Sequence, residues 1–220
     1  MTLDLSDEYV LGAMAAQEDE AAPGDPGLVV LDEPIEWKGT RYTELRLREP
    51  VTGEVLFATK VMGKRATSVT VRDAQLDLVG RVSGWPAAAI MMLPVTVQDD
   101  AIVFVTDFEE NARRPLDEDP DRTPELRLLF SPPVEAVGRS HAEMLLREPR
   151  GDQRRRYDVT RERETPEATL QAEINLVADV ADWQLAAVLK VPISKFARAS
   201  DYLTGFFIRG PRTGRRSRPN

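Results

Sequence analysis

The sequence lacks several residue types on which common protein chemistry depends. It contains no cysteine and a single histidine, His141, in 220 residues. The absence of cysteine excludes disulfide scaffolds, thiolate catalysis, iron–sulfur clusters and cysteine-ligated zinc, and one histidine excludes triads and histidine-rich metal sites. No nucleophile or second histidine supports His141 as a catalytic base. The sequence therefore predicts a protein without cofactor, metal ion or enzymatic activity.

Long hydrophobic runs are also missing. No stretch approaches the ~18–20 apolar residues that a membrane helix needs, and the N-terminus has no basic region typical of a signal peptide. The net charge of −8 and the isoelectric point near 4.9 make nucleic-acid binding unexpected. Hydrophobic residues still make up 42%, which is ordinary for a globular protein. We expect a cytoplasmic protein without membrane or nucleic-acid partners.

Charge is distributed unevenly along the chain. Residues 1–37 hold ten acidic residues and no lysine or arginine, whereas residues 209–220 hold five arginines and no acid. Such ends are typical of solvated tails, so we predict a disordered acidic arm over residues 1–27 and a disordered basic tail over 209–220. The alternative is a docking arm at one or both ends, with an apolar anchor near Tyr9, Val10, Leu11 and Met14.

The chain contains an internal repeat. Residues 34–50 (PIEWKGTRYTELRLREP) and 133–149 (PVEAVGRSHAEMLLREP) are identical at eight of 17 positions, at an offset of 99. A second pair of blocks, residues 76–108 and 174–206, is identical at ten of 33 positions, at an offset of 98. Two blocks in the same order at nearly the same offset predict a tandem duplication of a unit of about 80–90 residues.

Each unit begins with a pattern typical of a β-hairpin. An apolar run is followed by Lys38-Gly39 in one copy and Val137-Gly138 in the other, and then by an alternating stretch. Prolines within the first strand lack a ladder donor and predict an edge or a bulge there. In the second strand of the first hairpin, Leu45 and Leu47 are expected to face inward while arginine and glutamate face solvent.

The remainder of each unit has helical patterns. Apolar residues at helical spacing predict a helix over residues 68–83, and Thr165-Pro166-Glu167 is a strong helix start. The arginine-rich stretch 154–157 is interpreted as a solvated face or loop. Short helices are expected at 86–93 and 183–189, and last helices at about 95–110 and 195–208, with Ser194 as the cap of the latter.

These elements define the expected fold class, which is α+β: two tandem copies of a β-hairpin followed by three or four short helices. A unit of this size is small for an independent core, so we expect the copies to pack as a pseudo-symmetric pair with matching helices in a shared core. A charged, proline-rich stretch between the two copies has the composition of a linker and gives the boundary between the units. We predict a first unit at 28–112, a linker at 113–124 and a second, divergent unit at 125–208.

Two repeated features are candidate partner-binding sites. The paired LREP motifs contain Arg48, Glu49 and Pro50 in one copy and Arg147, Glu148 and Pro149 in the other. They either close the strand with a core leucine, a local ion pair and a terminating proline, or form an exposed docking edge. Trp85 and Trp183 occupy the same point of each unit, where tryptophan is more often a core residue than a ligand platform.

In combination, these motifs resemble the tail assembly chaperones of Mu-like and related myophages. The resemblance covers about residues 28–112 and rests on short, degenerate motifs: Pro34, Ile35, Gly39, Leu45, the closing LREP, Gly53 and Glu54, then Val82-Ser83-Gly84, Pro86, Leu93 and Pro94. Family members usually carry one unit. The second copy departs further from the pattern, since its glycine after LREP is shifted to Gly151 and VADVADW replaces VSGW.

The resemblance implies a role in assembly, not a reaction. Such proteins are expected to hold the long helical tape measure protein soluble, to recruit tail tube subunits, and to leave before the tail is finished. The implied partners are thus the tape measure and tail tube proteins, and a homo-oligomer is a further possibility. The implied location is the host cytoplasm, and the protein is not expected in the mature virion. The alternatives are a permanent component of a tail, tube or baseplate, and an enzyme or small-ligand protein, which nothing in the sequence supports.

Overall fold

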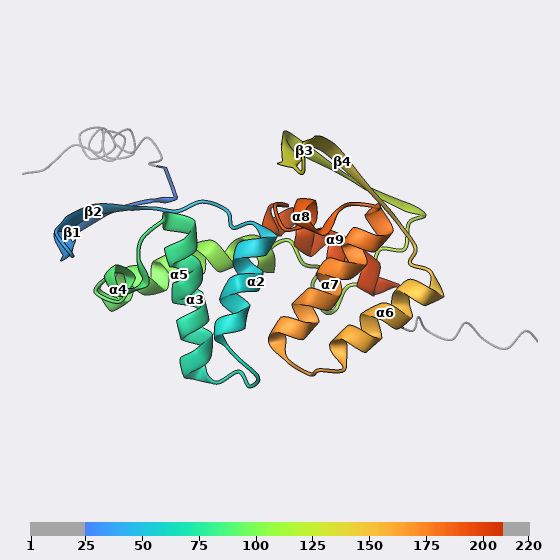
Figure 1. Cartoon of the computed structure of the whole chain (residues 1–220), viewed down its shortest axis with the longest axis horizontal. Coiled ribbons are helices and arrows are strands. Elements are labelled where there is room, and N and C mark those ends of the chain that lie inside the picture. Colours follow the sequence, from blue (N-terminus) through green and yellow to red (C-terminus); the bar gives the residue numbers. More distant parts are fainter. Residues whose placement is uncertain (1–24, 209–220) are drawn as a thin grey trace, which may run out of the picture.

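The computed structural model describes residues 25–208 and confirms an α+β fold made of two hairpin–helix units. Figure 1 shows both hairpins along the upper edge of the molecule and the longer helices of each unit below them. The first unit comprises β1 (Leu28–Trp37), β2 (Thr40–Arg46), α2 (Thr52–Val61), α3 (Ser68–Ser83), α4 (Ala87–Ile90) and α5 (Val95–Glu110). The second comprises β3 (Glu125–Ala136), β4 (Arg139–Arg147), α6 (Gly151–Arg161), α7 (Pro166–Ala181), α8 (Leu185–Val188) and α9 (Ile193–Gly205).

Both hairpins have the predicted two-residue turn. Lys38-Gly39 and Val137-Gly138 have positive φ angles at both positions, which is the type I′ geometry that matches the twist of antiparallel strands. The register shifts between Val30 and Ile35 in β1, and at the equivalent place in β3, so the predicted proline bulge is also confirmed.

Each unit has its own hydrophobic core between its hairpin and its helices. In the first unit, the predicted inward residues Leu45 and Leu47 are buried with Val79 of α3. In the second unit, Met144 of β4 and Ile174 of α7 are fully buried in the equivalent cluster. The amphipathic patterns of α3 and α7 therefore bury the faces that their spacing predicted.

A helix follows each LREP motif, and neither was located from the sequence. The stretch 154–157 lies within α6, where Arg155 and Arg156 are exposed as expected of a solvated face, whereas Tyr157 is buried. Both helices begin without a serine or threonine cap. Instead, the side chain of Glu54 accepts the Val51 N–H at 3.0 Å, and Gln153 accepts the Arg150 N–H at 2.8 Å. A carboxylate or amide three residues into the helix thus satisfies an otherwise unpaired donor.

The two units pack side by side as a pseudo-symmetric pair, and the equivalent helices α5 and α9 contact each other. The predicted shared core is not formed, because the described residues divide into two core clusters, one in each unit. Leu56 of α2 is the buried exception, since it belongs to the first unit but packs in the second core. The units are therefore joined mainly through α2.

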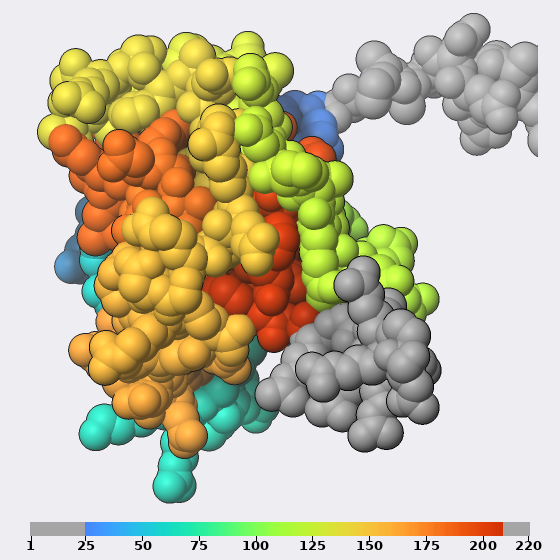
Figure 2. Space-filling model, turned by 90° about the vertical axis from the view of Figure 1, so that its right-hand side faces the viewer, coloured from blue at the N-terminus to red at the C-terminus, as the bar shows by residue number. Residues whose placement is uncertain are grey.

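The segment between the units packs along α9. The Tyr202 hydroxyl donates to the Thr123 carbonyl at 2.7 Å, and Arg122 donates to the Ile208 carbonyl at 2.7 Å. Figure 2 views the second-unit end, where α9 lies between α6 and this connecting segment. The acidic arm and the basic tail predicted from charge lie outside the described residues, apart from Asp25–Gly27. Among the helices of residues 25–208, none has the length and apolar character needed to cross a bilayer.

Candidate functional site

The hydrogen-bonded contact between the units, which we call the junction, joins two segments that we name by their sequence. The first LREP turn, residues 47–53, lies against the second proline segment, residues 189–194, at the place in Figure 1 where α2 begins beside α8 and α9. Val51 and Pro192 form an isolated antiparallel β-bridge. The backbone hydrogen bonds run from Thr52 N–H to Val191 O at 2.9 Å, from Gly53 N–H to Leu189 O at 2.8 Å, and from Ile193 N–H to Pro50 O at 2.9 Å.

Glu49 completes this contact by capping a helix of the other unit. Its Oε1 accepts the backbone N–H of Ser194 at 2.8 Å. Ser194 lies in the first turn of α9, where N–H groups have no partner within the helix and where negative charge is favoured by the helix dipole. The predicted cap at Ser194 is wrong, because the helix already begins at Ile193 and the capping side chain comes from the first unit.

Arg48 holds the turn to the start of α2. Its guanidinium makes two hydrogen bonds to Glu54, at 2.6 and 2.9 Å. Partial burial would by itself raise the pKa of Glu54, but the hydrogen bonds from Arg48 and from the Val51 N–H outweigh it and leave that pKa below its ordinary value. The Glu54 hydrogen bond in turn raises the pKa of Arg48. The local ion pair expected within the motif is thus made with Glu54, outside it.

Small residues allow this close approach. A Cβ atom added to Gly53 would lie 3.0 Å from the carbonyl oxygen of Leu189, which leaves room for little more than hydrogen. Thr52 is fully buried, and its hydroxyl donates to the Val191 carbonyl at 2.9 Å. The first LREP turn is therefore part of the fold, with Pro50 buried and Glu49 engaged across the junction.

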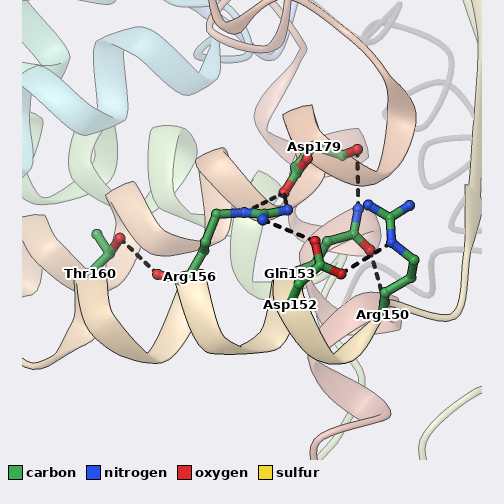
Figure 3. Close-up of polar contacts among 6 residues, drawn as sticks. All are labelled: Arg150, Asp152, Gln153, Arg156, Thr160 and Asp179. Carbon is green, nitrogen blue, oxygen red and sulfur yellow. Dashed lines mark hydrogen bonds and ion pairs between the residues drawn. The ribbon is translucent and has the colours of Figure 1, made fainter.

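The second LREP turn, residues 146–152, makes no equivalent contact within the described residues. Arg147 pairs with Glu125 of the neighbouring strand at 2.9 Å, and Glu148 is exposed. Pro149 is only half-buried. Figure 3 shows the polar network that follows, in which Asp152 binds Arg150 and Arg156, and Arg156 also binds Asp179 of α7. The hydrogen bond from Arg150 lowers the pKa of Asp152. This turn remains open to a partner.

The two tryptophans occupy equivalent positions, as the repeat predicts. Trp85 packs against Tyr42 in a tilted arrangement with ring centroids 4.5 Å apart, and Trp183 packs in the same way against His141 at 4.3 Å and Phe130 at 5.6 Å. Both are half-buried at the edge of their unit's core, not fully buried. His141 therefore serves as an aromatic packing partner for Trp183.

Trp183 also borders a groove in the second unit, which we call the α6–α7 groove. It has a volume of about 640 Å³ and lies among α6, α7 and α8. Exposed Val159 and Leu185 contribute apolar surface, while two arginines and two aspartates, Arg155, Arg156, Asp179 and Asp182, give it a rim of mixed charge. An open apolar groove with a charged rim suits the apolar face of a helix. Its lining is completed by Gln153, Tyr157, Thr160, Asn175, Leu176 and Ala178.

The residues of the junction that sequence reasoning missed are Thr52, Gly53, Leu189 and Val191. A signal for Gly53 was present, since it belongs to the motif that follows LREP, but its function depends on a segment more than 130 positions away. Within residues 25–208, no group of three or more histidine or acidic side chains is placed to hold a metal ion. The arrangement offers surfaces for binding and a contact between units.

Comparison with known families identifies the class of protein that these two units form. The model of phage tail assembly chaperone proteins, E, or 41 or 14, matches the chain twice, at residues 28–109 and 128–208. The chain therefore belongs to the phage tail assembly chaperone family, as a tandem duplication, and functions in tail assembly. No curated protein and no solved structure matches it.

Proposed function

We propose that this chain binds the tape measure protein of its phage, keeps it soluble and helps to recruit tail tube subunits around it. The observation that carries the proposal is the double family match over both units. A long helical client has apolar stripes that aggregate unless they are covered, and an acidic partner with net charge −8 keeps the complex soluble. The protein acts by binding, without catalysis, in the host cytoplasm, and leaves before the virion is complete.

The α6–α7 groove is the client site that we favour. It combines exposed Val159 and Leu185 with the half-buried ring of Trp183, and its length runs between helices. A helical client would place apolar residues at intervals of three and four along it, and polar residues of that client would meet the rim of mixed charge. Of the candidate residues from the sequence, Trp183 lies in this groove.

Co-expression with the tape measure protein of the same genome tests the function. The client is expected to be soluble and to co-elute with the chain, and to aggregate alone. A client that is equally soluble alone, with no complex, would overturn the proposal. Mass spectrometry of purified virions separates a chaperone from a permanent tail component, because only the latter is present in stoichiometric amount.

Matched variants test the groove. Leu185→Asp and Val159→Asp place a charge on exposed apolar positions of the groove and are expected to lower client recovery without unfolding the chain. Leu129→Asp, at a more exposed apolar position on β3 outside the groove, is the control and should retain the client. Equal recovery with all three variants would exclude this groove as the client site.

A further inference from the structure

The junction joins the LREP turn of the first unit to the proline segment of the second. The repeat supplies a second copy of each segment, and these two copies do not contact each other because they lie at opposite ends of the molecule. The second LREP turn lies on the second-unit end, where the chain passes from β4 to α6. The first proline segment, residues 91–96, lies at the opposite end of Figure 1, where α4 leads into α5. A contact between unlike surfaces does not close on itself after two units.

The first proline segment has the features of its buried counterpart but is uncovered. Val95 is 65% exposed, whereas the equivalent Ile193 is fully buried beneath the first LREP turn. Met91, which corresponds to Leu189, is 60% exposed, and the adjacent Met92 is 50% exposed. An apolar cluster at a helix start, covered in one repeat and bare in the other, indicates a surface that a partner covers.

The polar groups of this segment are also unpaired. Within residues 25–208, the backbone N–H groups of Val95 and Thr96 find no acceptor, whereas those of Ile193 and Ser194 bind Pro50 and Glu49. The second LREP turn retains the two acceptors in the equivalent places, the Pro149 carbonyl and the exposed Glu148 carboxylate. A carboxylate at this helix start would be favoured by the dipole, as it is at α9.

We propose that the second LREP turn of one copy of this chain docks on the first proline segment of another copy, repeating between chains the contact that joins the units within the chain. Glu148 accepts the Thr96 N–H, the Pro149 carbonyl accepts the Val95 N–H, and Met91 and Val95 become buried. Copies then associate head to tail into open chains whose consecutive units are related by one repeated step.

Two differences weaken this association. Gly151 stands where the first unit has Thr52, so the hydroxyl that donates to the Val191 carbonyl has no counterpart. Asp152 stands where the first unit has Gly53, which approaches the Leu189 carbonyl so closely. Arg150 and Arg156 hold the Asp152 carboxylate, as Figure 3 shows, but its Cβ still occupies space that the intrachain contact leaves empty. The contact between chains is therefore weaker than the contact within the chain, which also benefits from the tether between units.

Sedimentation velocity of the purified full chain, from micromolar to near-millimolar concentration, tests the proposal without any client. Association is expected to rise with concentration and to pass beyond the dimer. Val95→Asp, which sets a second carboxylate beside Glu148, and Glu148→Arg, which opposes the helix dipole, should each weaken it by at least about tenfold. Asp152→Gly should strengthen it, and Leu116→Asp, at a fully exposed linker position, should leave it unchanged.

A mixing experiment distinguishes this contact from any symmetric one. A Val95→Asp chain retains its second LREP turn and a Glu148→Arg chain retains its first proline segment, so the two together should form a heterodimer although neither associates alone. A wild-type chain that stays monomeric at every concentration overturns the proposal, as does association that neither variant weakens. If the wild-type chain is monomeric and Val95→Asp loses the client, the first proline segment is a client surface and not a contact between copies. The role in tail assembly does not depend on any of these results.

Discussion

The carboxylate of Glu49 caps the first turn of α9 at Ser194, 145 positions later in the chain, through a hydrogen bond of 2.8 Å. One side chain of the first unit thereby completes a helix of the second. The equivalent carboxylate, Glu148, has no such partner in the described residues. The two copies of one motif therefore have different surroundings, one packed between the units and one exposed to solvent.

Glu49→Ala is expected to lower the free energy of unfolding by about 1–2 kcal/mol, because a helix start loses its cap and a backbone N–H loses its acceptor. Glu148→Ala is the matched control and should change it by less than about 0.5 kcal/mol, since this side chain is exposed. Urea denaturation followed by tryptophan fluorescence measures both. Equal effects of the two substitutions would contradict the assigned role of Glu49.

The two glycines after the LREP motifs should respond oppositely to alanine. An added Cβ on Gly151 meets nothing within 4 Å, so Gly151→Ala should stabilise the chain by about 0.5–1 kcal/mol through the entropy of the unfolded state. At Gly53 the new methyl group would lie 3.0 Å from the Leu189 carbonyl and push the units apart, which should cost about 1 kcal/mol. Thermal unfolding of both variants provides the comparison. A stabilising Gly53→Ala would show that the junction has room for the added methyl group.

Val137 is strained in the second hairpin turn. Its φ angle is 51°, in the left-handed region that a β-branched residue adopts at a cost. Val137→Asn creates the Asn-Gly sequence that type I′ turns favour and should stabilise the chain by about 1 kcal/mol. Lys38→Asn, in the equivalent turn with φ of 48°, should give a smaller gain because lysine is not β-branched. Chemical denaturation of the pair checks the order of the two effects.

Acid should weaken the start of α2. The pKa of Glu54 is lower in the folded chain than in the unfolded one, so its contribution is complete above the unfolded pKa of about 4.3 and is lost as the pH falls through the lower, folded value. Glu54→Gln keeps a side-chain oxygen that can accept the Val51 N–H, as Gln153 accepts the Arg150 N–H in α6, but it loses the ion pair with Arg48. Because Arg48 is half-exposed, the variant should remove only about 0.5–1 kcal/mol of the acid-dependent loss. Stability curves from pH 7 to pH 3 measure this, and unchanged acid sensitivity would refute it.

The two equivalent tryptophans should contribute similarly to stability. Trp85→Ala and Trp183→Ala each remove a half-buried ring and its aromatic neighbour contact, and each is expected to cost about 2–4 kcal/mol. Trp37→Ala serves as the control and should cost less, because this half-buried ring at the end of β1 lies outside both core clusters. Near-wild-type urea midpoints for both repeat positions would mean that these rings contribute little to the core.

The sequence predicted those parts of the fold that depend on local pattern. The turns at Lys38 and Val137, the proline bulges and the helix from Ser68 to Ser83 follow from glycine position, missing donors and apolar spacing. The helices after LREP escaped because Glu54 and Gln153 supply their caps in place of an N-terminal serine or threonine. Alignment of the two repeats also predicted that Trp85 and Trp183 are equivalent.

The junction depends on contacts that no local pattern encodes. The pairing of Val51 with Pro192 and the packing of Leu56 in the other unit's core are determined by how two whole units fit together. Small size predicted that the units would pack, but not which surfaces would meet. A repeat shows which segments are equivalent, and only the three-dimensional arrangement shows that equivalent segments have unequal partners.

The one-residue difference between the two repeat offsets falls between paired helices. α2 and α6 begin 99 positions apart, whereas α3 and α7 begin 98 apart, so the loss lies in the connections 62–67 and 162–165. Residues 63–67 are exposed, and Figure 1 shows this connection at the lower edge, away from the hairpins and from the junction. Since this connection already tolerates a change of length, a gold or fluorescent label can be attached here and used to count copies on growing tails by electron or light microscopy.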